Sequence, residues 1–183
     1  MVFTHSFLPY STERLILRKF IDADIEQFLS YRQDPEIARY QSWSMFSYSK
    51  AKSFIDEMQT LKFGIPGEWF QIAIAEKQDN SLVGDIGIQV YLENPTTVEI
   101  GFTLDRKAQG KGYAQEAVQA LIDFLFDFEG INQVIAITDA RNQPSINLLI
   151  RLGMKLAHSL EVEFKGQWCI ENTFILEKED CLL

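Results

Sequence analysis

The sequence contains few of the residues that build metal sites and disulfide frameworks. It has two cysteines and two histidines in 183 residues. Cys169 and Cys181 do not have the short spacing of metal ligands, and His5 and His158 stand alone. We therefore expect no metal site and no disulfide framework, and we interpret the cysteines as buried or surface thiols.

Long hydrophobic runs are missing as well. The N-terminus does not place a basic segment before an apolar one, as a secretory signal does. The apolar stretch at residues 121–128 is interrupted by Asp123 and Asp127. These features argue against a leader and a membrane span, and predict a cytoplasmic protein without a membrane partner.

Basic residues are outnumbered: the chain has 17 Lys and Arg against 26 Asp and Glu, a net charge of −9. A nucleic-acid backbone is therefore not the expected main partner. The acidic balance suits a cationic substrate, although an acidic surface commonly serves only solubility. With 46% hydrophobic residues and no internal repeat, the chain is expected to form one domain over residues 1–183, with a core from about residue 12 to about residue 178.

A strand, a glycine turn and a helix follow one another in the middle of the chain. Residues 98–104 are mostly apolar and predict a strand. Apolar residues then recur at intervals of three and four from Ala114 to Phe128, which predicts an amphipathic helix. Between the two lies a glycine run, which consists of Gln109, Gly110, Lys111, Gly112, Tyr113 and Ala114.

The glycine run suits the binding of a phosphate or pyrophosphate. The first N–H groups of a helix have no intrahelical acceptor and lie at the positive end of the helix dipole. Gly110 and Gly112 let the backbone approach an anion closely, and Lys111 adds a positive charge. Glycines between a strand and a helix also serve as plain turn residues. The run matches neither a Walker loop nor a full dinucleotide-binding fingerprint, which would need a glycine in place of Gln115.

The remaining segments predict an α/β fold. A strand at residues 14–18 precedes three helices. Asp22 and Asp34 are expected to cap the first two, with Pro35 at the first position of the second, and the third begins near Ser49. Further strands are expected at residues 69–75, 81–91, 97–104, 134–137, 155–164 and 167–176, with a helix at residues 142–153. A strand–helix–strand crossover after an antiparallel meander requires a mixed, mostly antiparallel sheet, here of about six to seven strands, with helices on both faces.

The glycine run also matches a known pattern. It resembles the Q/R-x-x-G-x-G/A pattern of the GNAT superfamily of N-acetyltransferases, in which these amides bind the pyrophosphate of acetyl coenzyme A (acetyl-CoA). Other segments look like the branch that includes the ribosomal-protein N-terminal acetyltransferases, so that the resemblance covers nearly the whole chain. These segments are residues 12–18, 34–36, 82–84, 98–102, Asn142 with Ser145, and residues 152–154. The resemblance implies the GNAT-like acyl-CoA N-acyltransferase fold, acetyl-CoA as co-substrate and no metal.

Acetyl transfer to an amine needs a group that takes the amine's proton. Glu99 lies in an otherwise apolar strand near the expected cleft, where burial would raise its pKa toward a useful value. It is our candidate for the base or for a substrate-binding group, and a solvent-facing or salt-bridged strand residue is the alternative. Glu161, Glu163 and solvent are the other candidates for the base.

The departing thiolate needs a proton or a hydrogen bond. Many members of the superfamily have a tyrosine seven residues after the asparagine that Asn142 matches, but Leu149 occupies that position here. Ser145 matches the serine used in the ribosomal branch and is our candidate, against the alternative of a first-turn residue that caps the helix. Asn142 is expected to contact the cofactor, although asparagine before a helix also serves as an N-cap.

The resemblance gives the strand end at Phe102, Thr103 and Leu104 a backbone role, in which it pairs with the pantetheine and the acetyl carbonyl. The acceptor side of the cleft is expected in the least patterned region, residues 31–67. Aromatic residues of this region either line the cleft or pack as core, and they are Tyr40, Trp43, Phe46 and Tyr48.

The sequence therefore predicts an acetyl-CoA-dependent N-acetyltransferase that acts by direct attack in a ternary complex. The expected acceptor is a protein N-terminal α-amine. A small amine such as a polyamine, an amino acid or an aminoglycoside is the first alternative. A CoA-binding regulatory domain without turnover is the second, and Leu149 is its only sequence hint. A homodimer remains open.

Overall fold

The structure is a computed structural model that describes residues 7–43, 46–127 and 130–181. One mixed sheet of eight strands forms its centre, in the order β1-β2-β3-β4-β5-β6-β8-β7. Neighbouring strands pair antiparallel except β5 and β6, which are parallel. The predicted fold class is confirmed. The strand number exceeds the expected six to seven, because β1 has only two residues and leaves no sequence pattern.

The elements have the following bounds. The strands are β1 (Tyr10–Ser11), β2 (Leu15–Arg18), β3 (Trp69–Glu76), β4 (Leu82–Val90), β5 (Thr97–Leu104), β6 (Gln133–Asp139), β7 (Lys155–Phe164) and β8 (Gln167–Glu177). The α-helices are α1 (Ile25–Arg32), α2 (Pro35–Ala38), α3 (Tyr48–Thr60), α4 (Tyr113–Asp127) and α5 (Gln143–Arg151), and the 3-10 turns are η1 (Asp22–Asp24), η2 (Arg106–Ala108) and η3 (Lys178–Cys181). His5 and Phe128, which entered the expectations above, lie outside the described residues.

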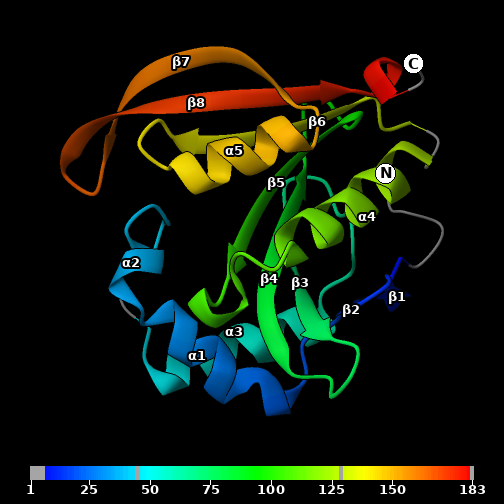
Figure 1. The fold of residues 1–183 in the computed structure, drawn as a ribbon, viewed down its shortest axis with the longest axis vertical. Coiled ribbons are helices and arrows are strands. Elements are labelled where there is room, and N and C mark those ends of the chain that lie inside the picture. The colour runs from blue at the N-terminus through cyan, green and yellow to red at the C-terminus, as the bar shows by residue number, and fades with distance from the viewer. Residues whose placement is uncertain (1–6, 44–45, 128–129, 182–183) are drawn as a thin grey trace.

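Helices cover both faces of the sheet, as Figure 1 shows. The larger apolar cluster lies between the sheet and helices α4 and α5, and includes Ile100 and Leu121. The smaller cluster lies under α1 and α3, and includes Phe28 and Ile55. On β3, Ile72 and Ile74 belong to the larger cluster and Ala73, between them, to the smaller one, as the two-residue period of a strand requires.

Two of the three expected helix caps are confirmed. Asp34 caps α2 and Asn142 caps α5, each through a side-chain oxygen that accepts a backbone N–H. Asp22, expected to cap the first helix, was a wrong prediction. It lies inside the 3-10 turn η1, where the carboxylate of Asp24 accepts the N–H of Ile21 at 2.8 Å.

β5 and β6 separate partway along their length. They pair over three positions only, and the last of these joins Glu99 to Ile135. β5 continues to Leu104 and β6 to Asp139, so the two strands diverge beyond Glu99 and form a fork. Within the described residues, the edge of β5 that faces β6 has no neighbouring strand beyond this point.

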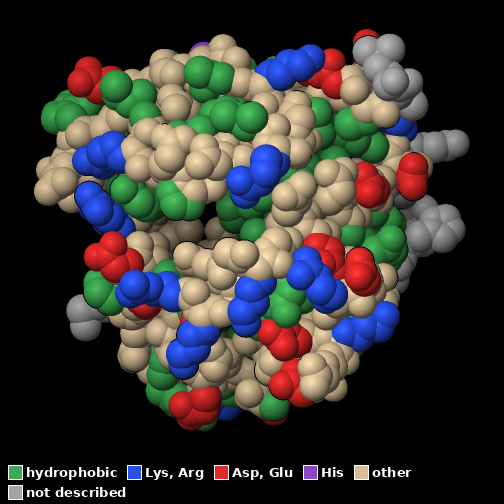
Figure 2. All heavy atoms as spheres, in the orientation of Figure 1, with side chains coloured by type: hydrophobic (Ala, Val, Ile, Leu, Met, Phe, Trp, Pro, Cys, Tyr) green, Lys and Arg blue, Asp and Glu red, His purple; other side chains and the backbone are tan. Residues whose placement is uncertain are grey.

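The open end of the fork is bridged by the segment after α2. Lys165, in the turn between β7 and β8, donates from its ammonium to the carbonyls of Ala38 and Trp43 at 2.8 and 2.5 Å. The hydroxyl of Tyr40 donates to the carbonyl of Arg141 at 3.4 Å. The molecule is hollowed between these contacts and the fork, as Figure 2 shows. Among the described ranges, none of the helices has the length and apolarity needed to cross a membrane.

Candidate active site

The glycine run lies between η2 and α4, at the lower side of the hollow. Gly110 and Gly112 have φ values of 75° and 80°, a conformation that favours glycine. α4 begins at Tyr113, and the N–H of Glu116 donates to the carbonyl of Gly112 at 3.0 Å. The N–H groups that precede this bond therefore point out of the helix end, which is the geometry of an anion site.

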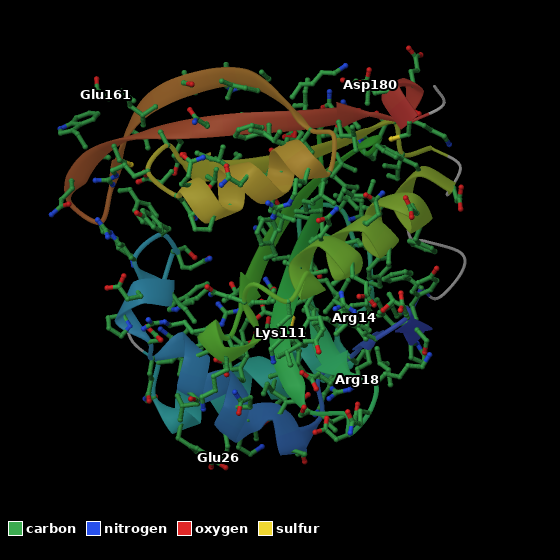
Figure 3. The ribbon with its side chains drawn as sticks, viewed as in Figure 1. Arg14, Arg18, Glu26, Lys111, Glu161 and Asp180 are labelled. Carbon is green, nitrogen blue, oxygen red and sulfur yellow. The ribbon has the colours of Figure 1, made fainter. Side chains whose placement is uncertain are left out.

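Arg14 and Glu116 fasten this loop to β2. The Nε of Arg14 donates to the Oε2 of Glu116 at 2.7 Å, and its Nη1 donates to the carbonyl of Lys111 at 2.8 Å. The Thr12 hydroxyl donates to the same carboxylate at 2.6 Å. Partial burial alone would raise the pKa of Glu116, but the bonds from Thr12 and Arg14 outweigh it and the pKa is lowered. Figure 3 shows Arg14 and Lys111 near the start of α4.

Basic side chains gather around the hollow although the chain as a whole is acidic. Figure 2 shows Lys and Arg on both sides of it. Arg106, Lys107 and Lys111 are exposed within or just before the glycine run. This distribution gives the loop a local positive charge, which suits a ligand with several phosphates.

α5 begins on the other side of the fork. Asn142 accepts the backbone N–H of Ser145 at 3.4 Å. Ser145 is half-buried, and its hydroxyl has no hydrogen-bond partner in the part of the chain that the structure describes. Leu149 is 0% exposed and packs in the larger core. The position of the superfamily's usual tyrosine is therefore filled by a core residue.

The end of β5 lies beyond the fork, where it has no neighbouring strand on its β6 side among the described residues. Thr103 and Leu104 are buried, and Phe102 packs against the larger core. The amide nitrogen of the Gln109 side chain donates to the carbonyl of Leu104 at 3.1 Å, which ties the glycine run to the end of β5.

Glu99 lies at the last paired position of the fork. Its Oε2 accepts the hydroxyl of Tyr91 at 2.8 Å. Burial raises the pKa of Glu99, the bond from Tyr91 opposes this, and the charge of Glu171 raises the pKa further. Glu161 and Glu163 are exposed on β7, and Figure 3 shows Glu161 at the outer side of the hairpin. They do not join Glu99 at the fork.

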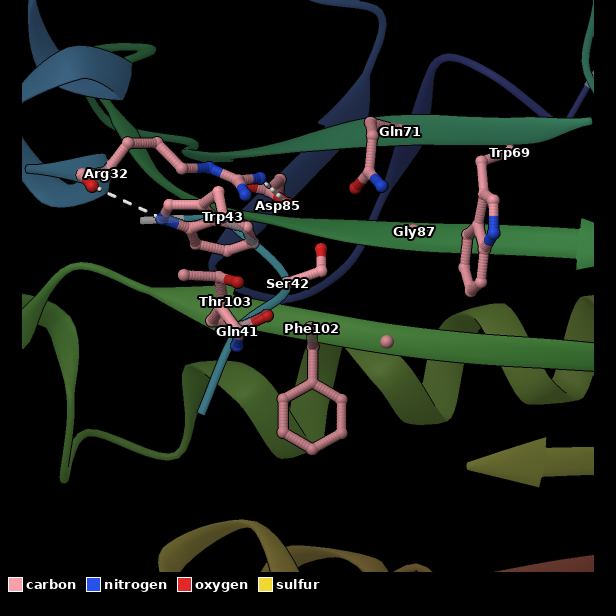
Figure 4. Close-up of a pocket in the computed structure, with 11 residues that line it drawn as sticks. Arg32, Gln41, Ser42, Trp43, Trp69, Gln71, Asp85, Gly87, Phe102 and Thr103 are labelled. Atoms are coloured by element: carbon pink, nitrogen blue, oxygen red, sulfur yellow. Dashed lines mark hydrogen bonds and ion pairs between the residues drawn. The ribbon is translucent and has the colours of Figure 1, made fainter. Parts of the chain in front are cut away.

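A cavity of about 210 Å³ lies beside the fork, on the α1 face of the sheet (Figure 4). Gly87 on β4 and Gly101 on β5 are directly opposite each other and form its floor. A Cβ at Gly101 would meet nothing within 4 Å, and one at Gly87 would lie 2.5 Å from the Nε2 of Gln71. Gly101 therefore leaves open space on this face, whereas the side chain of Gln71 covers Gly87. Gln71 and Ser42 point toward each other above them.

One end of the cavity is built by a buried ion pair. The Nη2 of Arg32 donates to both carboxylate oxygens of Asp85, at 2.8 and 2.9 Å, and the Tyr31 hydroxyl donates to the same carboxylate. The Trp43 ring lies 3.6 Å from the guanidinium carbon of Arg32, and its N–H donates to the Arg32 carbonyl at 3.3 Å. Trp69, 40% exposed, lines the other end.

The Arg32–Asp85 pair leaves no pattern in the sequence. The two residues are 53 positions apart, and isolated charges at that separation give no local signal. The aromatic residues between α2 and α3 gave a partial signal of the cavity. They were expected either to line the cleft or to pack as core, and both roles occur. Trp43 lines the cavity, whereas Phe46 is buried in the smaller core.

Comparison with known proteins gives the family. Residues 14–155 match the acetyltransferase (GNAT) domain. The chain belongs to the GNAT acetyltransferase family. It is 34% identical to the uncharacterized N-acetyltransferase p20 of Bacillus licheniformis over 145 residues, which are 79% of this chain and 80% of the relative. The GNAT chain is therefore an acetyl-CoA-dependent N-acetyltransferase.

Solved structures agree with this fold. A GNAT-family acetyltransferase from Bacillus anthracis has a TM-score of 0.81 at 26% identity, over 92% of this chain and 98% of the other. RimL, a ribosomal L7/L12 alpha-N-protein acetyltransferase in complex with coenzyme A, has a TM-score of 0.79 at 16% identity, over 92% and 97%. A spermidine N-acetyltransferase from Vibrio cholerae in complex with CoA and spermine has a TM-score of 0.78 at 15% identity, over 94% and 100%. The last two likenesses concern the fold alone.

Proposed function

We propose that this GNAT acetyltransferase transfers the acetyl group to a protein N-terminal α-amine. The observation that carries the proposal is the cavity beside the fork, whose lining combines neutral polar side chains with a carboxylate that is already neutralised. A peptide N-terminus carries one amine, and amide groups follow it. Gln41, Ser42 and Gln71 line the cavity and can hydrogen-bond with such amides.

A polyamine is a poorer fit to this lining. Each additional ammonium group needs a carboxylate, because an unpaired cation in a partly buried site is costly. Asp85 is the buried carboxylate of the cavity, and Arg32 and Tyr31 occupy its oxygens. The names of the structural neighbours do not decide the question, since RimL acts on a ribosomal protein and the Vibrio cholerae enzyme on spermidine.

The proposed arrangement places the diphosphate of acetyl-CoA on the amides of residues 109–114 and the pantetheine along β5 at Phe102, Thr103 and Leu104. Asn142 contacts the cofactor from the start of α5. The acceptor nitrogen attacks the thioester carbon from the cavity side, in a ternary complex. The N–C bond forms, and the C–S bond then breaks.

Protons and charge move between two side chains in this scheme. Glu99 takes the proton that the amine loses, directly or through a water. Its raised pKa makes it a better base than an ordinary carboxylate. The hydroxyl of Ser145 donates a hydrogen bond to the departing sulfur, which then takes up a proton as free CoA.

A panel of amines tests the acceptor class. The release of CoA is measured with a thiol reagent for a lysine-free peptide with a free N-terminus, for the same peptide N-terminally acetylated, and for spermidine. We expect the free peptide to exceed spermidine in kcat/KM by about tenfold or more, or about 1.4 kcal/mol, and the blocked peptide to give no turnover. A preference for spermidine would overturn the acceptor assignment.

Calorimetry complements the panel, because it measures the binding of acetyl-CoA independently of turnover. Tight binding of acetyl-CoA without turnover on the peptide or on spermidine would place the acceptor among other amines, such as amino acids and aminoglycosides, and would also overturn the assignment.

A further inference from the structure

Tyr91 is the only described residue whose hydroxyl reaches the carboxylate of Glu99. It follows the last residue of β4, and its N–H donates to the carbonyl of Thr97 at 3.0 Å. Tyr91 and Glu99 therefore project from neighbouring strands on the same face of the sheet, one row apart. We infer that Tyr91 is a positioning residue, which fixes the Glu99 carboxylate at the fork for proton transfer from the acceptor amine.

The contact has the properties that positioning requires. The bond is 2.8 Å long and joins a hydroxyl to a carboxylate, which makes it stronger than a bond between neutral groups. Burial, together with the bond to Glu99, raises the pKa of Tyr91 to about 12. The phenol therefore remains a donor over the working range of the enzyme. A glutamate side chain has three rotatable bonds, and this anchor removes much of that freedom.

The charge of Glu171 affects the pKa of Glu99 in the direction opposite to the bond from Tyr91. Glu171 lies on β8, across the fork, and its charge raises the pKa of Glu99, whereas the bond from Tyr91 lowers it. Gln89 faces Glu99 from β4 and Ile135 from β6, and neither is ionisable. Within the described residues, Tyr91 and Glu171 are thus the two groups that tune this carboxylate from opposite sides.

This arrangement predicts opposite effects for two conservative variants. Tyr91→Phe removes the bond, so the carboxylate moves more freely and holds its proton to higher pH. We expect kcat to fall roughly threefold to thirtyfold and the acidic limb of kcat/KM to shift to higher pH. Glu171→Gln removes the repulsion, and we expect the same limb to shift to lower pH.

The inference rests on the proposed role of Glu99, and the experiment separates the two. We would measure the pH dependence of kcat/KM for wild type, Glu99→Gln, Tyr91→Phe and Glu171→Gln with the same acceptor, together with the Kd of CoA. Tyr10→Phe is the matched control, since Tyr10 is 42% exposed on the edge strand β1, outside the acceptor region. An unchanged Kd of CoA and a Tm no lower than that of wild type show that each variant keeps its fold.

Loss of the acidic limb in Glu99→Gln, with opposite shifts in the other two variants, supports the inference. If Glu99→Gln loses the limb and Tyr91→Phe superimposes on wild type, the positioning role is overturned and the base assignment stands. If Glu99→Gln itself superimposes on wild type, the base assignment fails and the inference fails with it.

Discussion

Gly112 and Gly166 have nearly the same backbone conformation in two different places. Their φ values are 80° and 74°. A Cβ at Gly166 would meet nothing within 4 Å, whereas one at Gly112 would lie 3.3 Å from the Nη2 of Arg14. Both positions strain an L side chain, but only Gly112 lies in the glycine run. The pair therefore separates backbone strain from interference with a ligand.

We predict that Gly112→Val raises the Kd of CoA at least about tenfold, or about 1.4 kcal/mol, because the side chain blocks the approach to the loop amides. Calorimetric titration with CoA measures the change, and Gly166→Val is the control for strain alone. Equal Kd values in wild type and in both variants, with the fold intact, would remove the glycine run from the cofactor site.

Ser145 is the second residue whose proposed role can be isolated. Its hydroxyl has no partner among the described residues, and the cap of α5 is the side chain of Asn142. We predict that Ser145→Ala lowers kcat by roughly tenfold to a thousandfold and leaves the Kd of CoA within about threefold, since the lost bond forms mainly as charge develops on sulfur. Steady-state kinetics with chemistry rate-limiting measures this effect.

The control for Ser145→Ala is Ser49→Ala, which changes an exposed serine in the first turn of α3. A kcat within about twofold of wild type for Ser145→Ala would leave Ser145 without a part in catalysis.

Individual site residues differ in how far the sequence reveals them. The glycine run is local, so its residues and their helix are visible as a pattern. Glu99 is visible because it is polar among apolar neighbours. Arg32 and Asp85 are not, because only the packing of α1 on β4 brings them within 2.8 Å. Tyr91 is hidden for the same reason, since its contact with Glu99 depends on the register between two strands.

At the scale of elements, turn and cap residues predicted most of the helix and strand boundaries. Lys165 and Gly166 have φ values of 51° and 74°, which are those of the tight hairpin turn expected between the last two strands. Strand and helix bounds agree within a few residues because Gly, Pro, Asn and Asp mark their ends. The three-position pairing of β5 with β6 could not be predicted, since no sequence pattern states where two parallel strands separate.

The β7–β8 turn has a second role, as the contact that bridges the fork. Lys165 donates to the carbonyls of Ala38 and Trp43, and Trp43 lines the proposed acceptor cavity. We predict that Lys165→Met raises the KM of the acceptor roughly threefold to tenfold, up to about 1.4 kcal/mol, with little change in the Kd of CoA, because the methionine keeps the apolar stem and loses the donors.

Acceptor saturation curves and CoA titrations measure the two quantities separately. Lys155→Met is the matched control, since Lys155 lies at the other end of β7 and pairs with Asp180 at 2.7 Å. A change in CoA affinity with no change in acceptor KM would contradict the role of the turn at the acceptor loop.

At the scale of the whole molecule, the proposed active site lies where several structural features lower the free energy of unfolding. Within the described residues, the fork leaves the edge of β5 beyond Glu99 without a neighbouring strand. The two floor glycines border a cavity, and Glu99 is partly buried as an ionisable group. Each feature costs free energy in the folded chain. Each also provides what acetyl transfer needs: a backbone edge, space for an acceptor and a carboxylate with a raised pKa.

The stability cost of Glu99 can be measured through its pH dependence. Burial raises its pKa in the folded chain, so the unfolded chain releases this proton at a lower pH. The stabilising contribution is full below the unfolded pKa, about 4.3, and is lost as the pH rises through the raised folded pKa.

We therefore predict that Glu99→Gln has a higher Tm than wild type at neutral pH. The glutamine cannot ionise, and its carbonyl oxygen can still accept the Tyr91 hydroxyl. The difference should shrink toward about pH 4. Thermal unfolding followed by circular dichroism across this range measures it, with Glu161→Gln on the exposed face of β7 as the control. A Tm for Glu99→Gln at or below that of wild type at neutral pH would show that the ionised carboxylate is not a burden on the fold.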